Sequence, residues 1–169
     1  MADRPAQIFV YEHGDTLVFR VAGRGTMCHC VALRSRAEQA LGQGVRRLMV
    51  DLRECTYFDS TFLGMLLMLK RAAERGGAEF ALIDPSPECR RLLGQMRLDG
   101  HFPHVGPVCE AGPCCELATD HDSSSFQWNV VCAHQELASL EGPGAVGFRA
   151  LAERLAAEFK ASAPGRSAP

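Results

Sequence analysis

The sequence predicts an α/β fold, in which helices pack on a small mixed β-sheet and a C-terminal helical hairpin follows. Two strand-like segments around a Gly-Asp turn open the chain, and short apolar runs then alternate with segments of helical periodicity. The chain has 169 residues, of which 47% are apolar and 22% are charged. These proportions are typical of globular proteins, so a disordered or fibrous chain is excluded.

The opening segments predict a β-hairpin, and the segments after it predict a sheet covered by helices. Residues 8–11 and 17–21 are rich in β-branched and aromatic side chains, and Gly14-Asp15 between them is typical of a turn. Residues 60–75 are apolar on almost every side, which predicts a central buried helix. Further helices are expected at residues 30–41 and from Pro87 to Gly100, and buried strands at residues 48–52 and 80–83.

The last third of the chain predicts two helices, at residues 130–140 and 145–160, joined by Gly142-Pro143-Gly144. The second helix carries an apolar stripe of Phe148, Leu151, Leu155 and Phe159. Two isolated helices cannot bury this stripe, so we expect the hairpin to dock on the sheet domain or on a second copy of the chain. The expected organisation is a sheet domain at residues 1–105, an extension at 106–160 and a disordered tail at 161–169.

Charge and hydropathy limit the classes of partner. Eighteen basic and twenty acidic side chains give a net charge of −2, which provides no broad positive surface for nucleic acid or for an anionic membrane. The longest apolar run, from Phe62 to Leu69, is far shorter than the ~20 residues that span a bilayer. The first residues lack the pattern of a secretion signal. We therefore expect a soluble cytoplasmic protein that binds neither nucleic acid directly nor a membrane.

The segment before the central helix carries the most specific pattern in the chain. It reads Asp51-Leu52, then six residues, then Asp59-Ser60-Thr61, with Leu63-Gly64 at the head of the apolar helix. This pattern resembles the central motif of the STAS domain, the fold of bacterial anti-sigma factor antagonists. The order of the expected elements over residues 6–105 matches that fold as well. The turn Ala22-Gly23-Arg24-Gly25-Thr26 is similar to the family's loop after its second strand.

The resemblance implies a protein-binding switch rather than an enzyme. In the family, the hydroxyl residue after Asp-Ser is phosphorylated by a partner that is both a serine kinase and an anti-sigma factor. The unphosphorylated protein binds this partner and so regulates transcription indirectly. Carried over to this chain, the phosphorylated residue is Thr61, with Ser60 as the alternative. The partner-binding residues that the resemblance implies are Gly23, Arg24, Asp59, Ser60, Thr61 and Phe62.

The N-terminus of a helix is a physically suitable place for such a switch. Asp59 or Ser60 is expected to cap the helix while Thr61 faces solvent in its first turn. A phosphate there meets unpaired N–H groups and the positive end of the helix dipole, and it adds roughly −1.5 to −2 charges that repel a docked partner. Phe62 stands where the family often has Gly, and its side chain either packs inward or protrudes as a contact. Thr61 stands where Ser is commoner.

A second hypothesis belongs to another class of function. Some domains of this family are subunits of lipid or anion transport assemblies, or scaffold parts of sensory complexes. They keep the fold and a docking surface at a helix end without needing phosphorylation. Affinity capture from the native host distinguishes the two hypotheses, since the first expects a GHKL-type kinase and the second expects ABC-transporter subunits.

Eight cysteines raise the question of metal or thiol chemistry. No Cys-x-x-Cys occurs, and reduced, mostly buried thiols are expected in the cytoplasm. Soft metal ligands occur at Cys28-His29-Cys30, at Cys109, Cys114 and Cys115, and at Cys132-Ala133-His134. Their spacing fits no zinc module, and no motif pairs a cysteine with a histidine or forms a P-loop. We expect no metal, no cofactor and no catalytic residue.

Overall fold

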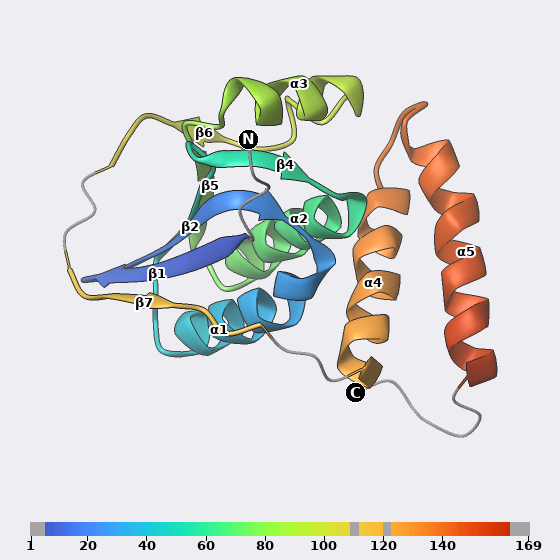
Figure 1. Ribbon diagram of the computed structural model, residues 1–169, viewed down its shortest axis with the longest axis horizontal. Helices are drawn as coiled ribbons and strands as arrows, with labels where there is room; N and C mark the ends of the chain where they lie inside the picture. Colours follow the sequence, from blue (N-terminus) through green and yellow to red (C-terminus); the bar gives the residue numbers. More distant parts are fainter. Residues whose placement is uncertain (1–5, 109–111, 120–122, 163–169) are drawn as a thin grey trace.

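The computed structural model describes residues 6–108, 112–119 and 123–162, which form a mixed sheet packed with helices (Figure 1). The strands are β1 (Gln7–His13), β2 (Thr16–Gly25), β3 (Arg47–Asp51), β4 (Cys55–Phe58), β5 (Glu79–Ile83), β6 (His104–Val105) and β7 (Cys114–Glu116). The helices are the short 3₁₀ helix η1 (Met27–His29), then α1 (Cys30–Gly42), α2 (Ser60–Arg75), α3 (Pro87–Gln95), α4 (Ser123–Ala138) and α5 (Ala145–Ser162). The predicted α/β class is confirmed.

The sheet has the order β6-β5-β3-β2-β1-β7, and β4 pairs with the far end of β2. Strands β1 and β2 form the predicted antiparallel hairpin, in which Gly14 takes a positive φ of 59° that favours glycine. Strands β2, β3, β5 and β6 run parallel, and β7 adds to the other edge antiparallel to β1. Because β7 comes from the expected extension, that extension contributes to the sheet of the domain that it follows.

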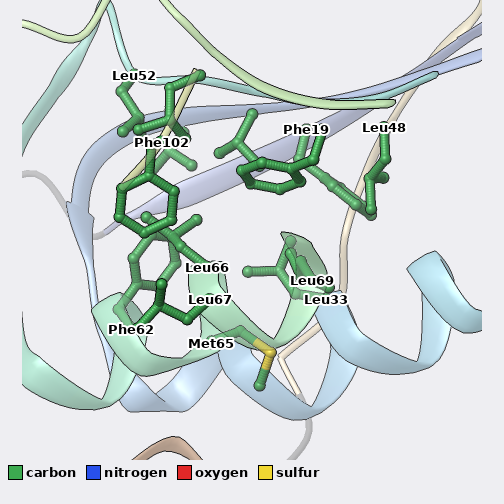
Figure 2. Close-up of a cluster of buried hydrophobic side chains, with 14 of the residues drawn as sticks. Phe19, Leu33, Leu48, Leu52, Phe62, Met65, Leu66, Leu67, Leu69 and Phe102 are labelled. Atoms are coloured by element: carbon green, nitrogen blue, oxygen red, sulfur yellow. The ribbon is translucent and has the colours of Figure 1, made fainter. Parts of the chain in front are cut away.

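Helix α2 lies at the centre of the molecule. Its sheet-facing side buries Phe62 and Leu66, which Figure 2 shows between the helix and the strands. Phe62 is fully buried, so the sequence alternative in which it protrudes is wrong. The physical reason is a space left by Gly25, where a Cβ atom would lie 2.9 Å from the Phe62 ring.

The two C-terminal helices form a hairpin that packs on the domain through its first member. Helix α4 packs on α1 and α2, and α5 packs on α4 (Figure 1). The expected apolar stripe of α5 is half-buried, and one of its members, Phe159, packs on Trp128 of α4 with the rings tilted at 42° and their centroids 5.3 Å apart. Of the two expected docking places, the sheet domain or a second copy of the chain, the structure shows the first.

Some predicted boundaries were wrong. Helix α4 begins seven residues before the expected residue 130, because the polar run that opens it is not read as helical from pattern alone. The expected tail begins too early, since Ala161 and Ser162 belong to α5, and its residues 163–169 lie outside the described residues. No helix in the described ranges is long and apolar enough to span a bilayer.

We predict that Gly25→Ala destabilises the protein by about 1–3 kcal/mol, because the added methyl group overpacks the buried Phe62 ring. Urea denaturation measures this change in the free energy of unfolding. Gly94→Ala in α3 is the matched control: no atom lies within 4 Å of its added Cβ, and better helix propensity gives up to about 1 kcal/mol. Equal effects of the two substitutions would contradict the packing described for Phe62.

Candidate functional site

The predicted motif forms a turn where β2 and β4 end side by side. Gly25 pairs with Phe58, and the Asp59 N–H donates to the Gly25 carbonyl at 3.1 Å. Earlier on the same two strands, the Gly23 N–H donates to the Glu54 carbonyl at 3.0 Å, and Gly23 takes a positive φ of 88°. The parallel β2–β4 ladder therefore fixes the start of α2 relative to the glycine turn.

Asp59 is the N-cap of α2 and joins it to the preceding loop. Its Oδ1 accepts from the Phe62 N–H at 2.8 Å, which is the capping bond expected for this position. Its Oδ2 accepts from the Met27 N–H at 3.0 Å, at the start of η1. One half-buried carboxylate thus holds both the helix start and the η1 loop.

Ser60 lies beside a histidine that comes from the C-terminal hairpin. Its Oγ is 3.1 Å from Nε2 of His134, whose Nδ1 is 2.8 Å from the Val130 carbonyl oxygen. A carbonyl only accepts, so neutral His134 carries its proton on Nδ1 and its Nε2 accepts from the Ser60 hydroxyl. His134 is only 4% exposed, which makes this a largely dry contact.

The expectation that Thr61 faces solvent is wrong, because its side chain is 3% exposed. Thr61 lies three residues before Gly64 and so shares one side of α2 with it. That side meets α4 so closely that a Cβ on Gly64 would lie 2.2 Å from the Ala133 carbonyl oxygen. The reason for the error is tertiary: α4 packs on the first turns of α2 through Ser60 and Gly64, and η1 packs on α2 as well, which local sequence does not indicate.

The structure brings the remaining predicted site residues together only in part. Arg24 is exposed and its guanidinium stacks over the Tyr57 ring, 4.4 Å from the ring centroid. Gly23 and Asp59 are half-buried at the same end of the sheet, whereas Phe62 belongs to the core. Sequence reasoning missed His134, for which no local pattern links it to a residue 74 positions away.

The cysteine and histidine groups do not converge within the described ranges, where no three such side chains or carboxylates form a possible metal site. Cys109 lies outside the described residues. Cys30 is buried, and burial raises the pKa of its thiol far above the ordinary value. In the Cys132-Ala133-His134 segment, Cys132 lies next to Arg34 of α1, whereas His134 contacts Ser60 of α2. The two possible metal ligands therefore have different neighbours. That the protein binds neither a metal nor a cofactor stays a prediction.

Comparison with known proteins places the domain in a family. Residues 8–107 match the family described as "Mlab, STAS domain". A STAS-domain containing protein of Pseudomonas aeruginosa is 50% identical over 57 residues, which are 34% of this chain and 56% of that protein. The chain therefore spans about half the length of this curated relative.

Solved structures show the same fold at low sequence identity. The unphosphorylated anti-sigma factor antagonist SpoIIAA of Bacillus gives a TM-score of 0.51 at 20% identity, covering 60% of this chain and 88% of that one. An anti-sigma factor antagonist from Mycobacterium paratuberculosis gives 0.52 at 22% identity, covering 62% and 88%. The family match ends before α4, so the hairpin that packs on the first turns of α2 lies outside it.

We predict that Asp59→Ala lowers the free energy of unfolding by about 1–2 kcal/mol, because α2 loses its cap and the Met27 N–H loses its acceptor. Thermal or urea denaturation measures the change. Asp59→Asn is the matched control, since its one amide oxygen still caps α2 while its NH2 group cannot accept from the Met27 N–H, so an intermediate loss is expected. A loss as large in Asn as in Ala would show that the capping bond to the Phe62 N–H contributes little.

Proposed function

The chain belongs to the STAS-domain family, and from this membership we propose that it is a cytoplasmic protein-binding switch of the anti-sigma factor antagonist type. Its partner is an anti-sigma factor that is also a serine kinase, and sequestering that partner releases a sigma factor. The observation that carries the proposal is the Asp59-Ser60-Thr61 turn, held at the N-terminus of α2 by the end of β2. The protein acts by binding, without catalysis of its own.

The geometry of this turn suits a phosphate-controlled surface. The N-terminus of a 16-residue helix attracts an anion through its dipole and unpaired N–H groups. The Asp59 carboxylate already uses both oxygens there, so a phosphate on Thr61 or Ser60 places a second anion beside it. Repulsion between this pair and an acidic or hydrogen-bonding partner surface supplies the release step. Exposed Arg24 and half-buried Gly23 border the same surface.

One observation favours the second candidate, a subunit of a transport or sensory assembly that binds its partner without phosphorylation. Thr61 is 3% exposed and the Ser60 hydroxyl is engaged by His134, so a kinase meets neither hydroxyl freely in this arrangement. Such a subunit would use the same helix end as a fixed docking surface. The two candidates differ in whether a phosphoryl group ever reaches this turn.

We predict phosphate on Thr61 when the full chain is incubated with Mg-ATP and an anti-sigma kinase captured from the native host. Fragmentation mass spectrometry locates the group. Thr61→Ala should abolish incorporation and keep partner binding, whereas Ser60→Ala should still be phosphorylated. Phosphate on Ser60 would move the acceptor by one residue, and phosphate on neither would favour the assembly-subunit candidate.

We also predict that Thr61→Glu lowers the melting temperature. A solvent-exposed carboxylate in the first turn of a helix would stabilise the protein by roughly 0.3–1 kcal/mol. Thr61 is buried, however, so the new charge must either lose its hydration or displace the covering helix, and both cost free energy. Thr61→Val, of similar shape and uncharged, is the control and should change the melting temperature much less. A stabilising effect of the glutamate would contradict the burial of this position.

A further inference from the structure

We propose that the side of α2 formed by Ser60, Gly64 and Arg71 is a helix-accepting partner surface, which α4 occupies within the same chain until a partner helix displaces it. The proposal rests on the proposed function only for the biological role of the partner. The partner contributes an amphipathic helix. The residues that this helix needs follow from the contacts that α4 makes at the same surface.

The surface is shaped for a closely packed helix. Gly64 leaves a notch into which the α4 backbone enters, since any Cβ at this position would meet the Ala133 carbonyl oxygen at 2.2 Å. Met65 points away from the sheet in Figure 2, yet it is fully buried. Helix α2 therefore buries apolar surface against elements other than the sheet, and the helices packed on it are α4 and α1.

Polar contacts at both ends of the crossing fix the register of the occupant. At the start of α2, the Ser60 hydroxyl pairs with His134 at 3.1 Å. Near its end, Arg71 pairs with Glu136 at 2.7 Å and donates to the Ser139 hydroxyl at 2.8 Å. A helix from a partner protein thus needs a small residue opposite Gly64, a hydrogen-bond acceptor one position later and an acidic residue toward its C-terminal end. It would bind as an amphipathic helix laid into a groove.

The docked helix also carries a feature that weakens its own docking. Asn129 of α4 is 6% exposed, and its Nδ2 donates to the Ser125 carbonyl while its Oδ1 has no hydrogen-bond partner among the described residues. A buried hydrogen-bond acceptor that has no donor destabilises the arrangement in which α4 is docked on α2. It does so relative to an arrangement in which water reaches the acceptor. The α4–α5 pair lies outside the family match and packs on the domain mainly through α4, so it can separate as one unit.

Hydrogen exchange on the unmodified full chain tests whether this unit opens. We expect the α4 and α5 amides to exchange together, and about tenfold or more faster than the β3 amides, because the helical pair opens without unfolding the sheet. If α4 exchanges only as slowly as β3, the helix leaves its place only on global unfolding and the proposal is overturned.

A variant of the covering helix tests whether the vacated surface accepts a helix. Ala133→Glu places a charged side chain against the Gly64 notch, and Gln135→Glu adds the same charge at an exposed position of the same helix as the matched control. A fluorescent peptide of residues 123–138 is the probe, followed by anisotropy. We expect binding to Ala133→Glu that is at least about tenfold tighter than to the wild type or to Gln135→Glu.

The outcomes separate this proposal from the proposed function. Equal peptide affinity for all three proteins, or no binding to a folded Ala133→Glu protein, would overturn the helix-accepting surface. If circular dichroism shows that Ala133→Glu does not fold, the exchange experiment on the wild type decides. Neither measurement uses a kinase or a sigma-factor pathway, so absence of phosphorylation would contradict the proposed function while leaving the covered surface intact.

Discussion

The structure depends on helix α2, whose N-terminal half has no side left to expose to water. Most of α2 between Thr61 and Leu69 is buried, and a single sheet can cover only one side of a helix. Helix α1 and the strands supply part of the cover, and α4 supplies the rest. The need to bury the remaining side of α2 explains why a hairpin beyond the family's own boundaries is packed so tightly on the domain.

This constraint also links the stability of the domain to the state of its site. The turn at Asp59 is held by the β2–β4 ladder on one side and by the η1 loop on the other. The next residue, Ser60, is held by α4. Between two consecutive residues the chain therefore passes from contacts inside the family domain to contacts with the extension, and a ligand that replaces α4 changes only the second set.

The sequence was sufficient for what local pattern controls. The Gly14 hairpin and the buried α2 follow from turn chemistry and hydropathy period. Strands β4, β6 and β7, of two to four residues, were not predicted, because such short strands are defined by their partners and not by their own composition. For the site, local capping rules were enough to predict Asp59 as the cap. The surroundings of the buried Thr61 were not predictable in this way, because its neighbours Ser60 and Gly64 contact His134 and Ala133, far away in sequence.

The position of one aromatic residue gives the molecule an intrinsic optical reporter. The chain contains a single tryptophan, Trp128, which lies in α4 against Phe159 of α5 and is not part of the hydrophobic core cluster. Indole emission therefore arises entirely from the covering hairpin and carries no background from the family domain. A change in tryptophan fluorescence when a ligand is added would therefore report a change in the α4–α5 hairpin, without any label, even when the sheet stays unaltered.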